Sequence, residues 1–165
     1  MTKLRFTVLT ISDRSSRGER PDTAGPALVE LINSQGWEVT RAEILPDDLG
    51  ILREMLTILA DRGGTDIILT TGGTGFAPRD ITPEATLAVI DRQAPGLVEA
   101  MRSASAAKSP HAMLSRAVSG MRGKVLIINL PGSPKAALEN LQIVLPALEH
   151  AVQLLQEDPK AEQGH

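Results

Sequence analysis

A buried strand, a glycine-rich loop and a helix start follow one another directly in the middle of this chain. The apolar residues 67–69 predict the strand, and three glycines fall within residues 72–75. Thr82 is the predicted N-cap of the next helix, and Pro83 is its predicted first residue. Backbone N–H groups of such a loop and of a helix N-terminus attract anions. The stretch therefore favours an anionic ligand.

Strand and helix signals alternate along the rest of the chain, which predicts an α/β domain with a mainly parallel sheet. The expected strands span 5–11, 37–44, 67–70, 117–121 and 125–130, and the expected helices span 24–35, 49–62, 83–92, 96–105 and 135–157, the last interrupted or kinked near Pro146. We expect one domain over residues 1–157 and a polar, disordered tail over residues 158–165.

Composition argues against several classes of protein. Only 2% of the residues are aromatic and the net charge is −3, which speaks against nucleic acid as a partner. The chain has no cysteine, so disulfides, cysteine-bound zinc and thiol catalysis are excluded. No apolar run is long enough to cross a membrane, and the N-terminus lacks the organisation of a secretory signal. We therefore expect a cytoplasmic protein.

Polar residues follow four of the predicted strands at their carboxyl ends. Asp13, Asp47 and Asp80 follow the first three strands, and Gly132 and Ser133 follow the strand at 125–130. In open parallel sheets, ligands bind at the carboxyl ends of strands. If the sheet is parallel here, these four loops converge on one edge and form a binding site.

The glycine-rich loop matches neither of two common nucleotide motifs. It lacks the Gly-Lys-Ser/Thr ending of a Walker A loop, and Pro78 stands where a dinucleotide fingerprint has its third glycine. A tight turn without a ligand is the alternative interpretation. The three glycines beside Arg79 and Asp80 exceed what a turn needs, so the sequence favours a phosphate-binding loop.

Asp47 and Asp80 are the candidate pair of carboxylates for a magnesium ion. Mg²⁺ beside a nucleotide is commonly held by one or two carboxylates, water and phosphate oxygens. Each position has a structural alternative, because Asp80 suits a turn and either Asp47 or Asp48 suits a helix N-cap. Asp13 suits an Asx turn equally well, and Ser133 suits an N-cap. The three histidines have no metal-ligand spacing.

Several motifs, in this order, resemble those of the MogA/MoaB-type molybdenum cofactor biosynthesis proteins, a group that includes the G domains of gephyrin and of its plant counterpart. The resemblance covers roughly residues 6–155. It rests on Ser12-Asp13, Leu45-Pro46-Asp47, the stretch from Thr70 to Thr86, Ala94-Pro95-Gly96, Met113-Leu114-Ser115-Arg116, Gly120-Met121-Arg122-Gly123, the stretch from Ile127 to Ser133 and Leu145-Pro146-Ala147-Leu148.

This resemblance implies a three-layer α/β/α fold and molybdopterin adenylyltransferase activity, with ATP and molybdopterin as substrates and Mg²⁺ as the cofactor. It implies that Asp47 and Asp80 are catalytic and hold the metal. The residues implied to bind the substrates are Gly72, Gly73, Thr74, Gly75, Gly132 and Ser133 around the nucleotide, and Ser12, Asp13 and Ser115 on the pterin side. It further implies a homotrimer, or a hexamer, and a separate protein that inserts molybdenum.

Three other functions compete with this one. A molybdopterin-binding carrier or scaffold would bind pterin without turnover, and some short MoaB-like chains are catalytically silent paralogues. A nucleotide-processing enzyme related to CinA would share the fold but not the substrates. The complete string from Gly72 to Asp80 favours the MogA/MoaB group, and the presence of both aspartates argues against a silent paralogue.

Overall fold

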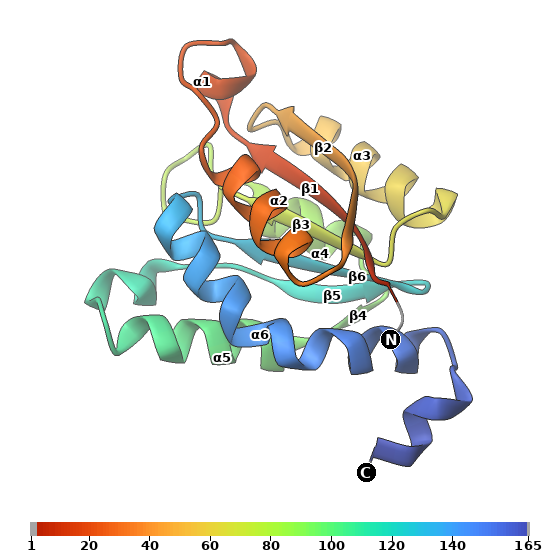
Figure 1. Ribbon diagram of the computed structural model, residues 1–165. Coiled ribbons are helices and arrows are strands. Elements are labelled where there is room, and N and C mark those ends of the chain that lie inside the picture. The colour runs from red at the N-terminus through yellow and green to blue at the C-terminus, as the bar shows by residue number, and fades with distance from the viewer. Residues whose placement is uncertain (1–2, 165) are drawn as a thin grey trace.

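A six-stranded sheet forms the middle layer of the molecule, with strand order β2-β1-β3-β6-β5-β4 (Figure 1). The computed structural model describes residues 3–164. Strands β1 (Arg5–Ile11), β2 (Glu38–Leu45), β3 (Ile67–Thr71) and β6 (Val125–Leu130) are parallel. Strands β5 (Ser119–Arg122) and β4 (Arg92–Gln93) add an antiparallel edge. The expected mainly parallel sheet is confirmed.

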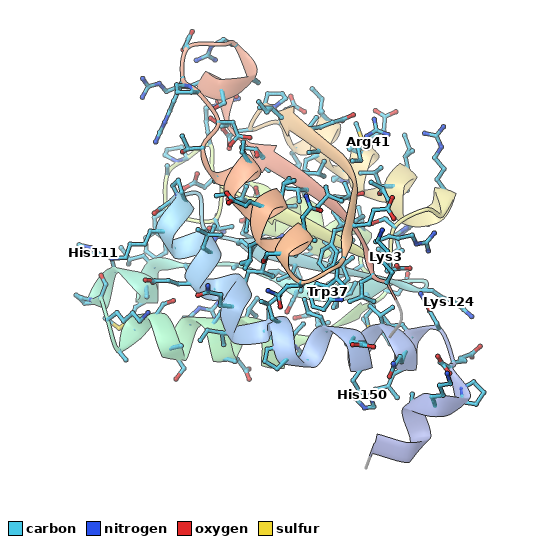
Figure 2. All side chains as sticks on the ribbon, in the orientation of Figure 1. Lys3, Trp37, Arg41, His111, Lys124 and His150 are labelled. Carbon is cyan, nitrogen blue, oxygen red and sulfur yellow. The ribbon has the colours of Figure 1, made fainter. Side chains whose placement is uncertain are left out.

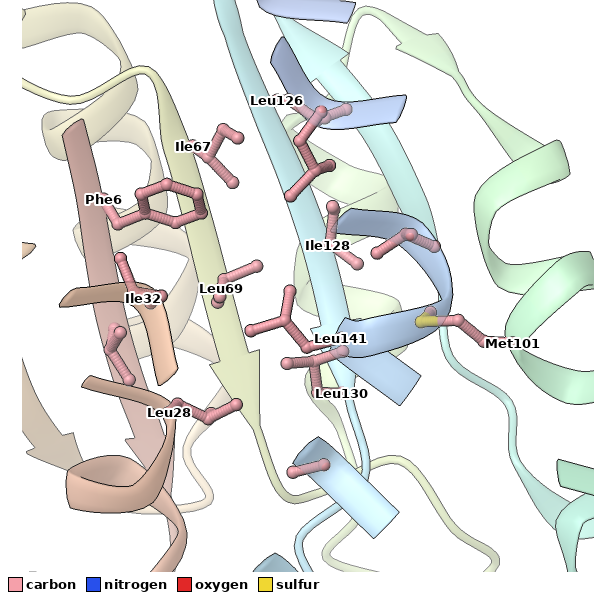
Figure 3. Close-up of a cluster of buried hydrophobic side chains, with 14 of the residues drawn as sticks. Phe6, Leu28, Ile32, Ile67, Leu69, Met101, Leu126, Ile128, Leu130 and Leu141 are labelled. Carbon is pink, nitrogen blue, oxygen red and sulfur yellow. The ribbon is translucent and has the colours of Figure 1, made fainter. Parts of the chain in front are cut away.

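Helices cover both faces of this sheet. On one face, α2 (Ala24–Ser34), α5 (Pro95–Ala106) and α6 (Pro134–Leu155) pack over a core that includes Phe6, Leu69 and Ile128 (Figure 3). On the other face, α3 (Leu49–Arg62) and α4 (Thr82–Val89) cover a second core that includes Leu9, Ile68 and Ile127. The α/β/α layering implied by the resemblance is therefore present. Residues 67–69 point to alternate faces and are buried on both, which explains their unbroken apolar run.

Local sequence signals place several element boundaries correctly. The side chain of Asp48 caps α3 by accepting a hydrogen bond from the amide of Ile51 at 2.9 Å. Ser133 caps α6 in the same way through the amide of Ala136, with Pro134 at the first turn. These caps satisfy amides that would otherwise lack a partner within the helix. The predicted bounds of β1, α3 and β6 are confirmed.

The starts of α2 and α4 differ from simple side-chain capping, and the predicted N-cap of α4 is wrong. Thr23 precedes α2 but makes no side-chain capping bond, and Asp22 instead accepts a bond from the amide of Gly25 at 3.0 Å. Thr82 is the first residue of α4 rather than its cap, and its hydroxyl donates to the carbonyl of Gly72 at 3.0 Å. At α4, the contact with Gly72 takes the hydroxyl that the local pattern assigns to the helix cap, whereas at α2 the capping bond comes from the residue just before Thr23.

The other differences concern short elements that periodicity does not detect. Residues 13–16, for which no element was predicted, form a single helical turn, α1 (Asp13–Ser16). Residues 106–116, also without a predicted element, contain a 3-10 helix, η1 (Pro110–Leu114). The helix predicted to reach residue 92 ends at Val89, because Ile90 is extended and leads into β4. Helix α6 is not interrupted at Pro146. Burial of Val144 and Leu148 on either side of this proline stabilises the helix through it.

The polar C-terminal segment also contains structure. A 3-10 helix, η2, spans Pro159–Gly164, and the side chain of Ala161 is buried. The amide of Ala161 donates to the carbonyl of Asp158 at 2.9 Å, and the carboxylate of Asp158 accepts from the amide of Lys160. Composition alone suggested a disordered tail here; residue 165 lies outside the described residues. Within residues 3–164, no helix has the length and apolarity needed to cross a bilayer.

Candidate functional site

The carboxyl ends of β1, β2, β3 and β6 meet at one edge of the sheet, where they border a cleft of about 340 Å³. We call this the carboxylate cleft. Its lining includes Ser12, Asp47, Gly72, Gly73, Asp80, Gly132 and Ser133. The cleft lies where the chain connections from β1 and β3 turn to opposite sides of the sheet, the usual ligand position in open α/β folds. The predicted convergence of four loops is confirmed.

Two glycines let the loop after β3 turn close to the end of β1. Gly72 has φ of +105° and Gly73 has φ of +67°, in the range that side chains disfavour. A Cβ on Gly72 would lie 2.3 Å from the carbonyl oxygen of Ile11, and one on Gly132 would lie 3.2 Å from the Cα of Gly72. Three backbone segments therefore approach one another here, as a phosphate-binding loop requires.

Hydrogen bonds hold this loop to its neighbours. The amide of Gly72 donates to the carbonyl of Leu130 at 3.1 Å, and the hydroxyl of Thr71 donates to the carbonyl of Pro131 at 2.6 Å. The amide and hydroxyl of Thr82 bind the carbonyls of Gly73 and Gly72. The loop is thus fixed to β6 on one side and to the start of α4 on the other, which pre-organises its backbone.

Asp13 and Asp47 join the loops after β1 and β2. The amide of Asp13 donates to Oδ2 of Asp47 at 2.8 Å, and the amide of Asp47 donates to Oδ1 of Asp13 at 3.0 Å. Arg79 reaches across from the glycine-rich loop, pairs with the carboxylate of Asp13 and donates to the carbonyl of Asp47 at 2.9 Å. The three loops therefore share one network of charge-assisted bonds.

The two carboxylates of this network have pKa values displaced in opposite directions. The hydrogen bond and charge of Arg79 lower the pKa of Asp13. Burial raises the pKa of Asp47, and the nearby charges of Asp13 and Asp80 raise it further. Asp47 thus carries its charge at the cost of desolvation, and a bound cation would relieve that cost.

Asp80 lies at the C-terminal end of the loop that begins at Gly72. Its Oδ2 accepts a bond from the amide of Ala77 at 3.0 Å, and a Cβ on Gly75 would lie 2.9 Å from the same oxygen. On the other side of the cleft, Oδ1 of Asp47 lies 3.1 Å from the position of a Cβ on Gly73. Both carboxylates therefore need the glycines beside them.

Asp47 and Asp80 fit a magnesium ion better than a metal held by protein alone. Within the described residues, no group of three or more acidic, histidine or cysteine side chains is arranged to hold a metal. Mg²⁺ usually retains water and takes only one or two carboxylates together with phosphate oxygens. Two hard oxygen donors at a phosphate-sized loop match that chemistry. His111 and His150 lie well apart, on η1 and α6 (Figure 2).

A second cavity of about 320 Å³ lies on the other side of the glycine-rich loop. We call it the α5–α6 pocket, because Met101 of α5 and Asn140 of α6 line it. Thr74, Gly75 and Ser115 line this pocket and not the carboxylate cleft. The predicted site residues are therefore divided between two cavities separated by one loop, except Asp13, which lines neither and binds Asp47 instead.

Several residues around the site were not predicted to take part in it. Arg20 lines the carboxylate cleft, and Asn129 lines the α5–α6 pocket. Asn129 is fully buried and donates to the hydroxyls of Thr70 and Thr86 at 3.0 and 2.9 Å. A polar residue within the apolar run of β6 is a sequence signal for such a role. Arg20 stands in a polar loop and has no comparable signal.

Comparisons with known proteins agree with this geometry. Residues 7–150 match the family described as "Probable molybdopterin binding domain". The molybdopterin adenylyltransferase of Escherichia coli is 44% identical over 149 residues, which cover 89% of this chain and 76% of that protein. The crystal structure of the molybdopterin biosynthesis enzyme MoaB from Thermus thermophilus is 50% identical with a TM-score of 0.88, and the match covers 94% of this chain and 98% of that one.

Longer proteins also contain a matching segment. Gephyrin of Dictyostelium discoideum is 43% identical over 164 residues, which cover 93% of this chain and 23% of that protein. The present chain therefore spans about a quarter of the length of such relatives.

Proposed function

Because the chain belongs to the family of probable molybdopterin-binding domains, we propose that it acts in molybdenum cofactor biosynthesis as a molybdopterin adenylyltransferase. In this reaction a phosphate oxygen of molybdopterin attacks the α-phosphorus of ATP. A new phosphorus–oxygen bond forms, and the bond to pyrophosphate breaks. The products are adenylyl-molybdopterin and pyrophosphate.

The observation that carries this proposal is the pair of cavities on either side of one glycine-rich loop. A two-substrate transfer needs both reactants next to each other in fixed positions, and the loop from Gly72 to Gly75 borders both cavities. Its glycines allow backbone N–H groups to approach phosphate oxygens closely. Phosphoryl-type transfers depend mainly on such positioning and on charge stabilisation, so no cysteine or histidine nucleophile is required.

Asp47 and Asp80 would hold Mg²⁺ at the nucleotide phosphates. The ion would offset the negative charge that two phosphate-bearing substrates bring to a chain of net charge −3. Gly132 and Ser133 add the N-terminus of α6 to the same cleft, where it suits a phosphate group. Ser12 lies in this cleft, Asp13 orients Asp47, and Ser115 faces the α5–α6 pocket on the pterin side.

Pyrophosphate release tests the proposal. MgATP is incubated with and without molybdopterin, using the wild type, Asp80→Ala and a control variant. Asp61→Ala is a suitable control because Asp61, near the end of α3, is a carboxylate that pairs with Arg122 and lines neither cavity. We expect pterin-dependent release from the wild type and from Asp61→Ala, and its loss in Asp80→Ala. Binding of molybdopterin without any release by the wild type would instead favour a carrier or a silent paralogue.

The remaining features of the proposed function follow from the same resemblance. We propose that the protein works in the cytoplasm as a homotrimer, with a hexamer as the alternative assembly. A separate protein would then insert molybdenum into the adenylylated product. Analytical ultracentrifugation at several protein concentrations distinguishes the trimer from the hexamer.

A further inference from the structure

Arg116 binds both ends of the loop that carries Asp80. Its Nε donates to the carbonyl of Gly75 and its Nη2 donates to the carbonyl of Asp80, each at 2.7 Å. Its backbone amide also donates to the carbonyl of Thr74 at 2.8 Å. One residue thus makes three bonds to a loop that lies about 40 positions earlier in the chain.

Two other residues fix the guanidinium of Arg116 in this position. Glu84, in the first turn of α4, forms an ion pair with its remaining nitrogen, Nη1. Arg102 of α5 donates to the carbonyls of Ser115 and Ala117 on either side of Arg116, each at 3.1 Å. The backbone that carries Arg116 is therefore held from one side, and its side chain from the other.

Within the segment from Gly75 to Asp80, the other hydrogen bonds of Asp80 are made only to Ala77. Its amide donates to the carbonyl of Ala77 at 2.9 Å, and its Oδ2 accepts from the amide of Ala77 at 3.0 Å. Phe76, which follows Gly75, is 68% exposed and belongs to neither hydrophobic core. Residues 76–79 are exposed, so the conformation of the segment depends on the bonds of Arg116 at its two ends and on those of Arg79 to Asp13 and Asp47.

We propose that Arg116 is a positioning residue that holds Asp80 at the carboxylate cleft by fixing the carbonyls of Gly75 and Asp80. This role rests on the proposed function for its catalytic consequence, but the clamp on the loop can be measured without it. A planar guanidinium presents several N–H donors in a fixed fork, whereas a lysine ammonium is a compact charge on a flexible stem. Lysine at this position would keep the charge and lose the fork.

Hydrogen–deuterium exchange and kinetics test this role on the full chain. The variants are Arg116→Ala, Arg116→Lys and Arg122→Ala. Arg122 is a matched control because it also pairs with a carboxylate, that of Asp61, and donates to a carbonyl, that of Val89, but it lies outside both cavities. The peptide that covers residues 75–80 reports the loop, and pyrophosphate release with molybdopterin reports kcat and the KM for MgATP.

We expect both Arg116 variants to speed exchange in residues 75–80 by about tenfold or more, as the loss of charge-assisted bonds predicts, and Arg122→Ala to leave this segment unchanged. We expect kcat to fall by about 10²-fold in both Arg116 variants, the effect of moving a catalytic group by about 1 Å. Unchanged exchange in both variants, or wild-type kcat in Arg116→Lys, would overturn the proposal. If the wild type released no pyrophosphate while the variants still exchanged faster, adenylyl transfer would fail and the clamp would stand.

Discussion

Asp13 and Asp47 each donate a backbone amide to the other's carboxylate, at 2.8 and 3.0 Å, although they lie 34 positions apart in the chain. This reciprocal pair joins the ends of the parallel neighbours β1 and β2. It directs one oxygen of Asp47 to the neighbouring loop and leaves the other facing Gly73. The position of Asp47 in the cleft therefore depends on Asp13.

Replacing Asp13 should impair catalysis more than folding. Asp13→Ala removes the acceptor for the amide of Asp47 and the partner of Arg79, so we expect kcat for pyrophosphate release to fall by about 10- to 100-fold. Asp13→Asn keeps a carbonyl oxygen for the amide and should lose less. Asp48→Ala serves as the control, because it removes the N-cap of α3 at a cost of about 1 kcal/mol and should leave kcat unchanged. Equal kcat for Asp13→Ala and the wild type would contradict this role.

The raised pKa of Asp47 predicts how stability depends on pH. Between the ordinary carboxyl pKa of 3.8 and the raised value, the folded state binds more protons than the unfolded state. The contribution of Asp47 to the free energy of unfolding therefore falls as the pH rises through this window, and it stays low above it. The amide of Asp47→Asn does not titrate, so this variant does not lose stability as the pH rises through the window. Its free energy of unfolding relative to that of the wild type should therefore increase from pH 3 to neutral pH.

Asp13→Asn provides the comparison of opposite sign. Because Arg79 lowers the pKa of Asp13, the carboxylate adds stability above the ordinary pKa and loses it as the pH falls through the folded value. The stability of Asp13→Asn relative to the wild type should therefore decrease from acid to neutral pH. Thermal unfolding of the three proteins over this range measures both trends. The same sign for the two variants would show that the pKa assignments are wrong.

Alanine at Gly72 should destabilise the protein strongly. At φ of +105°, a Cβ would lie 2.3 Å from the carbonyl oxygen of Ile11, so backbone must move. We expect a loss of about 3 kcal/mol in the free energy of unfolding. Gly123→Ala separates strain from contact, because Gly123 has φ of +55° with no atom within 4 Å of the added Cβ, and should cost only about 1–2 kcal/mol. Denaturant unfolding of both variants tests the difference; equal losses would exclude the close approach as the cause.

Asn129 should contribute strongly to stability where β6 borders the α5–α6 pocket. Asn129→Ala leaves the amide of Val118 without its acceptor and removes both bonds to threonine hydroxyls, so we expect a loss of about 2–3 kcal/mol. Asn33→Ala, at an exposed position of α2, should change the free energy of unfolding by less than about 0.5 kcal/mol. Urea unfolding of the two variants provides the comparison. A loss below 1 kcal/mol for Asn129→Ala would show that the buried groups find other partners.

The sequence predicts the layers of this fold because strands and helices leave short-range patterns. The leucines at 52, 56 and 59 recur at helical spacing and are buried on α3, and the apolar run of β6 is buried throughout. The edge strand β4 has two exposed residues and no such pattern, so it was missed. The hydroxyl of Thr82 was assigned to a helix cap for the same reason, since its true partner, Gly72, lies ten residues away in a loop.

The sequence by itself determined the α/β class, the sheet edge at which the loops meet, and the aspartates and glycines that those loops carry. The tertiary structure alone decided that Asp13 orients Asp47, that the candidate residues fall into two cavities, and that Arg116 holds the loop of Asp80. Propensity and periodicity act over a few residues, whereas these contacts join residues more than 30 positions apart. Such contacts form only after strand pairing has fixed which loops become neighbours.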